Sequence, residues 1–232
     1  MQFFIKFVEE EGHYELTNLS KLLIVAVILG VLFLVSHFIK GDTKVKMSVK
    51  QLTVSALCLS VAFILSNAKF IKLFNGGSTT AFSMFFVTYI GYIFGPVVSF
   101  PAAVAYGLLQ LIVDPTILSI PQVLCDYIFA FGALGLSGFF HNKKYGMMIG
   151  YLVGALGRYV FAVLSGILFF AEYAPEGTPV LEYSLTYNAT YLFPEVAMTI
   201  VVLLIPAVRI ALNRIKIETI ESNNVRKEAT AG

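Results

Sequence analysis

Long runs of apolar residues, separated by short polar breaks, make up most of this chain. The runs are close to the roughly 20 residues that an α-helix needs to cross a lipid bilayer. Turn-forming pairs such as Gly95-Pro96 and Asp114-Pro115 mark the breaks. The pattern predicts membrane-spanning helices at residues 21–39, 51–67, 80–95, 97–113, 117–139, 146–171 and 187–211.

The composition agrees with a membrane protein. Of the residues, 58% are hydrophobic and 13% are charged, whereas a soluble domain carries roughly 25% charged residues. We therefore expect an all-α polytopic membrane protein. The 232 residues leave no room beside the spans for a separate catalytic domain. A net charge of +2 is small and gives no support for nucleic-acid binding.

The basic residues are divided unevenly between the two sides that the spans define. If Lys40 to Lys50 lie in the cytoplasm, alternation also places Lys143, Lys144 and the basic residues from Arg209 onward there. By count, eleven of the sixteen basic residues then lie inside. This positive-inside bias predicts an outside amino terminus and a cytoplasmic carboxyl terminus in the cell membrane.

Asp126 is the most costly residue in the predicted spans, because a charge at the bilayer centre costs about 2.5 to 3.5 kcal/mol even on a lenient scale. Gln122 lies one helical turn earlier, on the same helix face. Asp126 could be a helix-packing carboxylate that is satisfied by Arg158 or by tyrosine hydroxyls. The aromatic residues around it favour another interpretation, a counter-charge for a cationic ligand.

The span 146–171 contains a second ionisable residue and a stripe of small residues. Arg158 could pair with Asp126, with Glu195 or with an anionic ligand, and a structural ion pair is the favoured interpretation. Ala162, Gly166 and Phe170 follow at helical spacing. Such small residues usually allow close helix packing, but they could also leave a slot for a flat ligand with Phe170 as its roof.

Two further stretches suggest contacts. The segment from Tyr183 to Tyr191 is dense in hydroxyl, amide and ring groups, and Asn188 within it needs hydrogen-bond partners in a medium of low dielectric constant. On the span 51–67, Ala56 and Ser60 have the small-xxx-small spacing. This spacing predicts a helix–helix contact, which could be an intermolecular one.

Several kinds of chemistry find no support in the sequence. Cys58 and Cys125 lie in apolar runs and the three histidines are scattered, so we expect no metal and no cofactor. No phosphate-binding loop motif occurs, so ATP-driven transport would need a partner. An intramembrane enzyme using Asp126 with Arg158 or Ser165 remains an alternative, but the favoured interpretation is a protein that is not an enzyme.

A series of motifs in one order and spacing resembles a known family. The motifs are Gly76-Gly77-Ser78, Ser83-Met84, Tyr106 to Gln110, Gln122 with Asp126-Tyr127, Gly157-Arg158-Tyr159, Ser165-Gly166, Ala174 to Pro179, and Tyr183 to Tyr191. Together they resemble the thiamine-specific S components of energy-coupling-factor (ECF) transporters, the ThiT/YuaJ-like family. The likeness covers about residues 47–212.

The resemblance implies an architecture and partners. We expect a six-helix substrate-binding core at 47–213, an N-terminal extension at 1–46 with one extra transmembrane helix, and a charged cytoplasmic tail at 214–232. The family implies thiamine as the ligand, bound from outside. It also implies a transmembrane T component and two cytosolic ATPase subunits as partners, in contact with membrane lipid.

The resemblance also implies roles for individual residues. Asp126 matches the carboxylate that faces the thiazolium ring, Phe170 a stacking position, and Gly77 and Ser78 the loop that covers the pocket. Ala56 and Ser60 fall where the family contacts its T component. The remaining predicted substrate-binding residues are Tyr183, Asn188, Gly166, Gln122, Tyr127 and Ala162.

Two positions depart from the family pattern. Ala162 stands where the family commonly has histidine, and the chain contains no tryptophan, so stacking must come from phenylalanine or tyrosine. Loss of the histidine removes one polar contact with the ligand. A pyrimidine or thiazole precursor of thiamine, or a related vitamin, therefore remains an alternative ligand.

Overall fold

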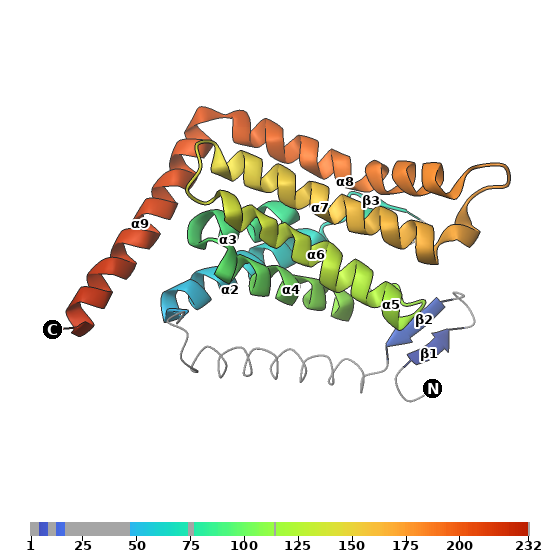
Figure 1. Ribbon diagram of the computed structural model, residues 1–232, viewed down its shortest axis with the longest axis horizontal. Coiled ribbons are helices and arrows are strands. Elements are labelled where there is room, and N and C mark those ends of the chain that lie inside the picture. Colours follow the sequence, from blue (N-terminus) through green and yellow to red (C-terminus); the bar gives the residue numbers. More distant parts are fainter. Residues whose placement is uncertain (1–4, 9–12, 17–46, 74–76, 114, 232) are drawn as a thin grey trace.

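The computed structural model describes residues 5–8, 13–16, 47–73, 77–113 and 115–231. Within them, α2 (Val49–Asn67), α4 (Pro96–Val113), α7 (Gly146–Phe169) and α8 (Val180–Leu204) lie along a common direction in one bundle (Figure 1). The bundle also contains the short α3 (Ser83–Phe94), and α9 (Pro206–Ala231) follows α8. The predicted span 21–39 lies outside the described residues.

The predicted span 117–139 is a composite helix over residues 120–140. It runs through α5 (Ile120–Val123), a π-helix (Leu124–Phe129), α6 (Ala130–Gly132) and a 3₁₀-helix (Ala133–Phe140). Ser119 starts this helix, because its hydroxyl accepts a hydrogen bond from the backbone N–H of Gln122. The π segment widens the helix where Asp126 lies, and such segments occur frequently at functional sites.

Five helices among the described residues are long and apolar enough to cross a bilayer, namely α2, α4, the composite helix, α7 and α8. Large apolar side chains such as Leu57, Ile64 and Leu168 are exposed on their outer faces, which suits a hydrocarbon surrounding. In contrast, α3 has 12 residues and is about 18 Å long. It is too short to cross the bilayer by itself, although a full span was predicted at 80–95.

Short strands occur where the sequence predicted none. Strand β1 (Ile5–Val8) pairs antiparallel with β2 (His13–Leu16), and β3 (Ile71–Lys72) pairs antiparallel with β4 (Ser78–Thr79). Strand β4 packs against α8. The β3–β4 hairpin explains why α3 starts later than predicted, since the chain is still extended at Thr79.

The last predicted span, 187–211, is displaced in the structure: α8 begins at Val180 and ends at Leu204. Its first turns contain many polar groups, and two of them, Ser184 and Asn188, form hydrogen bonds with backbone carbonyls of α7. Pro206 has no N–H and keeps Ile205 extended, with ψ of 117°. Helix α9 then leaves at an angle (Figure 1) and runs through the predicted boundary at 213/214 to Ala231.

Helix α3 lies near the centre of the bundle. Its buried residues Met84, Val87 and Ile93 belong to the main apolar cluster, and α3 packs against α2, α4, α7 and the 3₁₀-helix. Short η3 (Ala171–Tyr173) begins the connection from α7 to α8. The α7–α8 connection therefore lies at one end of the bundle, and the α8–α9 connection lies at the other (Figure 1).

Candidate ligand-binding site

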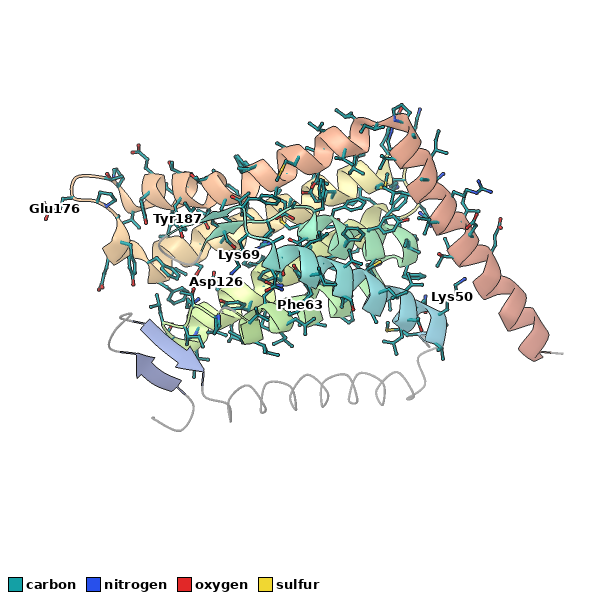
Figure 2. The ribbon with its side chains drawn as sticks, turned by 180° about the vertical axis from the view of Figure 1, so that it is seen from behind. Lys50, Phe63, Lys69, Asp126, Glu176 and Tyr187 are labelled. Atoms are coloured by element: carbon teal, nitrogen blue, oxygen red, sulfur yellow. The ribbon has the colours of Figure 1, made fainter. Side chains whose placement is uncertain are left out.

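A cavity of about 160 Å³ lies at the end of the bundle that contains the α7–α8 connection, called the cavity end below. Figure 2 shows Asp126, Lys69 and Tyr187 in this half, with Lys50 toward the opposite end. The predicted residues that line the cavity are Asp126, Tyr127, Ala162, Gly166, Phe170, Tyr183, Asn188, Gly77 and Ser78. Residues far apart in the sequence thus meet at one cavity.

Asp126 lies in the π segment, where the backbone N–H of Ala130 donates to the carbonyl of Cys125, five residues earlier. Its Oδ2 atom accepts a hydrogen bond of 2.6 Å from Nε2 of Gln122. Among the described residues, the Oδ1 atom has no hydrogen-bond donor and no cation within 4.0 Å. The carboxylate therefore lines the cavity with half of its accepting capacity unused.

Gln122 lies behind Asp126 and does not line the cavity, although the sequence predicted it as a ligand contact. The amide is fully engaged: Nε2 also donates to the carbonyl of Thr116, and Oε1 accepts from the backbone N–H of Leu118. Its position is therefore that of a residue that orients the carboxylate. Tyr127, the next residue of the π segment, lines the cavity, and its hydroxyl accepts from the backbone N–H of Thr116.

The ion pair favoured for Arg158 is wrong. Within the described part of the chain, neither Asp126 nor Glu195 forms a salt bridge with it. The guanidinium carbon of Arg158 lies 4.1 Å from the centroid of the Phe131 ring, a cation–π contact. Arg158 also lines the cavity, so the site brings its guanidinium and the Asp126 carboxylate to one cavity without a direct salt bridge between these two described residues.

A ladder of tyrosines lies on one face of α8. Tyr183, Tyr187 and Tyr191 follow at four-residue spacing, with ring centroids 5.8 and 5.9 Å apart along the series, and all three line the cavity. Only Tyr183 was predicted as a contact. The helical spacing in the sequence could have identified the other two.

Asn188 joins α8 to α7. Its Nδ2 atom donates to the carbonyls of Ser184, at 2.8 Å, and of Ala162, at 3.3 Å, and its Oδ1 accepts from the hydroxyl of Tyr191. Both N–H groups thus have protein acceptors, and one lone pair of Oδ1 is left for a guest. This accounts for a carboxamide inside a membrane helix.

Gly166 allows the close approach of α7 and α8, because a Cβ atom there would lie 2.1 Å from Oγ of Ser184. Helix packing, the usual role of small residues, is therefore part of its function, although it also lines the cavity. Ser165 beside it is 1% exposed, and its hydroxyl has no hydrogen-bond partner within the described residues. The sequence analysis did not include this cavity-lining hydroxyl among the ligand contacts.

Gly77 lies directly before β4 and against the tyrosine ladder. Its backbone N–H donates to the hydroxyl of Tyr187 at 3.0 Å, and a Cβ atom would lie 2.8 Å from the ring of Tyr191. Gly77 and Ser78 therefore cover one side of the cavity. Phe170, at the end of α7, lies against Tyr173 with ring centroids 5.9 Å apart.

Ala56 and Ser60 lie on the outer face of α2, away from the cavity, and both are exposed. The hydroxyl of Ser60 donates to the carbonyl of Ala56 at 2.8 Å, which satisfies it within the helix. These two residues leave a small, apolar surface that another helix could approach.

The cavity offers groups that can bind a guest. One carboxylate (Asp126), two cationic side chains (Lys69 and Arg158) and several aromatic rings line a cavity between membrane helices. The carboxylate and the ring faces together can receive a flat molecule that carries a positive charge. The described residues contain no group of three or more potential metal ligands. Fold and site together define a multi-pass membrane protein that binds a solute.

Comparisons with known proteins specify the class. Residues 52–214 match the model of the family described as thiamine transporter protein (Thia_YuaJ). The "Thiamine transporter ThiT" of Bacillus subtilis (strain 168) is 34% identical over 166 residues, which cover 66% of this chain and 84% of that protein. This chain belongs to the Thia_YuaJ family of thiamine transporter proteins, and the resemblance inferred from the motifs is confirmed.

The fold is also similar to that of a solved structure, ThiT from Listeria monocytogenes. The TM-score is 0.53 at 22% identity, and the match covers 75% of this chain and 95% of that one. The prediction of an all-helical polytopic membrane fold is therefore confirmed. At this identity the likeness concerns the fold alone.

Proposed function

We propose that this protein is the thiamine-binding S component of an ECF-type importer, which takes thiamine from outside and delivers it with an ATP-driven partner complex. The observation that carries the proposal is the carboxylate of Asp126, held by Gln122 at the wall of a ring-lined cavity. A permanent cation beside this carboxylate and under ring faces gains about 0.5 to 2 kcal/mol per cation–π contact in addition to the ion pair.

The proposed residue roles follow from the positions in the cavity. Asp126 faces the thiazolium ring, while Phe170 and the tyrosine ladder supply stacking surfaces. Asn188 accepts from the guest with the free lone pair of Oδ1, and Gly77 and Ser78 cover it. Gln122 acts through Asp126. Ala162 and Gly166 have small side chains, which leave space for the guest on the side of the cavity that α7 forms.

The partners and the orientation are part of the same proposal. The sequence has no phosphate-binding loop, so two cytosolic ATPases and a transmembrane T component would supply the energy. The exposed pair Ala56 and Ser60 on α2 supports a helix contact with the T component. The distribution of lysines and arginines supports an outside amino terminus and a cytoplasmic carboxyl terminus in the cell membrane.

Titration calorimetry on the purified protein in detergent tests the proposal. Thiamine should bind at micromolar concentration or below, and Asp126→Asn should weaken binding on the order of 100-fold, since removing one partner of a buried ion pair costs about 3 to 5 kcal/mol. Glu176→Gln is a matched control, because it removes an exposed carboxylate from the connection at the same end. Equal affinities for the wild type and Asp126→Asn would contradict the proposed site.

A thiamine precursor is the second candidate ligand, and Ala162 favours it, since a methyl group offers no polar contact to a whole thiamine molecule. Competition between thiamine and its separate pyrimidine and thiazole halves distinguishes the two. Thiamine should displace either half at lower concentration than the reverse. Tighter binding of one half would assign the protein to that precursor.

A further inference from the structure

Glu195 is a buried carboxylate in the middle of α8 that does not line the cavity. It is 2% exposed, and it accepts three hydrogen bonds: from the hydroxyl of Thr80 at 2.7 Å, from the hydroxyl of Ser83 at 3.0 Å, and from the backbone N–H of Met84 at 2.9 Å. All three donors belong to one short segment, residues 80–84. A carboxylate among membrane helices needs such compensation.

The segment that Glu195 holds is the link between the cavity cover and α3. Thr80 and Ser83 line the cavity, and Met84 lies in the first turn of α3. The residue before α3, Phe82, has a φ of 60° and offers no side-chain cap. Glu195 therefore supplies from α8 both an acceptor and a negative charge to an otherwise uncapped helix start.

The cover is attached to α8 at two points. Gly77 donates to the hydroxyl of Tyr187, and Thr80 and Ser83 donate to Glu195. Tyr187 and Glu195 are eight residues apart, about 12 Å along the helix. Between Gly77 and Tyr187 the hydrogen bond joins two neutral groups, whereas hydrogen bonds to a carboxylate are roughly twice as strong.

We propose that Glu195 is a positioning residue for ligand retention: it fixes residues 80–84 against α8 and thereby determines how slowly a bound guest leaves the cavity. The inference rests on the proposed function, that the cavity holds thiamine. Weakening the attachment frees the side of the cavity that Thr80 and Ser83 form. The guest then escapes faster, while its contacts with Asp126 and the tyrosine ladder stay unchanged.

The test measures dissociation and association rates of radiolabelled thiamine on the purified full-length protein. Glu195→Gln keeps the shape of the side chain but replaces one accepting oxygen by an amide, so we expect the dissociation rate to rise about tenfold. The association rate should stay close to that of the wild type. A purely structural role would lower the unfolding temperature without this selective change in one rate.

Ser99→Ala is the matched control, because it removes a hydroxyl that is 0% exposed and pairs with Ser137 away from the cavity. It should cost stability and leave both rates unchanged. Thr80→Val removes the donor of the 2.7 Å hydrogen bond to Glu195. This variant tests the proposal if Glu195→Gln does not fold. The double variant should dissociate no faster than the faster single variant.

The outcomes separate the two proposals. Wild-type protein that retains no thiamine would overturn the proposed function and, with it, the retention role. Wild-type retention, with dissociation rates in Glu195→Gln and Thr80→Val no higher than in Ser99→Ala, would overturn the role of Glu195 alone. A selective rise in the dissociation rate supports both.

Discussion

The two ends of the bundle use the same residue types in opposite ways. At the α9 end, the hydroxyl of Tyr89 donates to the carbonyl of Leu212 at 2.6 Å, and the hydroxyl of Tyr92 donates to Oδ1 of Asn213. Lys216 lies 3.8 Å from the Tyr92 ring centroid and donates to the carbonyl of His141. Tyrosines and a cation there connect α9 to the bundle.

At the cavity end, equivalent groups are left partly unused. Asp126 has one hydrogen-bond donor, Arg158 has a ring but no carboxylate, and Ser165 has no partner in the described part of the chain. Among the helices of residues 47–231 that the structure describes, α9 crosses the opposite end of the bundle (Figure 1). Polar groups in this membrane protein therefore stabilise the fold where backbone acceptors reach them, and remain available for a guest where none does.

Among the changes that compare the stability and the binding functions of the two ends, the largest effect is expected from Gly91, in the half of α3 that points to the α9 end. A Cβ atom there would lie 2.3 Å from Oγ of Ser137 and 2.7 Å from the backbone nitrogen of Gly138. Gly91→Ala should lower the free energy of unfolding by about 2 to 3 kcal/mol, because the packed backbone cannot move aside. Thermal unfolding in detergent measures this loss.

The control for this change is Gly132→Ala, whose new methyl group would meet only Val104, at 3.4 Å. It should be nearly neutral. Gly91 does not line the cavity, so thiamine affinity should be unchanged in molecules of Gly91→Ala that are folded. Weaker binding in that folded fraction would show that the two ends are not independent.

A smaller effect, on affinity, is expected from Gln122. Gln122→Leu keeps the volume but removes the 2.6 Å hydrogen bond to Asp126, and the carboxylate is then free to turn away from the guest. Thiamine binding should weaken about tenfold or more, since a hydrogen bond to a charged group contributes about 1.5 to 3 kcal/mol. Calorimetry measures the change.

Ser119→Ala tests whether the loss comes from Asp126 or from the helix start. It removes the cap that accepts from the backbone of Gln122 and costs about 1 kcal/mol of stability, but it leaves Asp126 held. Its affinity for thiamine should match that of the wild type. The interpretation of Gln122 would be wrong if both variants bound equally well.

Tyr187→Phe should have a modest effect. The change removes the hydrogen bond from Gly77 to the hydroxyl and keeps the ring in the ladder, so affinity should fall by about threefold, the value of one neutral hydrogen bond near 0.5 to 1 kcal/mol. Equilibrium dialysis with labelled thiamine measures it. If Tyr187→Phe lowered the affinity as much as Gln122→Leu, the hydrogen bond to Gly77 would contribute as much to binding as the orientation of the Asp126 carboxylate.

The smallest effect concerns pH and the α9 end. Burial lowers the pKa of the Lys216 ammonium below its ordinary 10.5. The folded chain therefore loses this proton at a lower pH than the unfolded chain, and stability should rise slightly as pH increases from the lowered pKa toward 10.5. Unfolding temperatures at pH 8 and 10 should show the rise, which Lys216→Gln should abolish and Lys143→Gln should retain.

Sequence reasoning located the helices of the core well where the apolar runs were uninterrupted. Helix α4, predicted at 97–113, is Pro96–Val113, and α7, predicted at 146–171, is Gly146–Phe169. The predicted start of α8 was wrong, because a stretch rich in hydroxyl and amide groups near Tyr183 is typical of a loop. Its hydrogen-bond partners on α7 could not be predicted. Hydropathy alone contains no information about such partners.

In the candidate site, too, some features could be predicted from the sequence and others could not. Asp126 stood out because a charge in a membrane span needs a reason, and the tyrosines of α8 were visible as a polar stretch. Gln122 was placed on the helix face of Asp126 from its spacing, but its bonds to the turn at Thr116 and Leu118 were not predicted. The position of Glu195 could not be predicted, since its donors come from residues 80–84. The contact of Arg158 with Phe131 was hidden for the same reason, and an ion pair was predicted instead.

The amino-acid sequence by itself determined that this chain is a helical membrane protein of the thiamine transporter family with a costly carboxylate at residue 126. Apolar run length, charge content and motif spacing are properties of the linear sequence, so they can be evaluated without knowing how the chain folds. Only the tertiary structure decided which polar groups are satisfied and which face the cavity. Hydrogen bonds that span a hundred residues or more, such as Thr80 to Glu195, depend on how the helices pack.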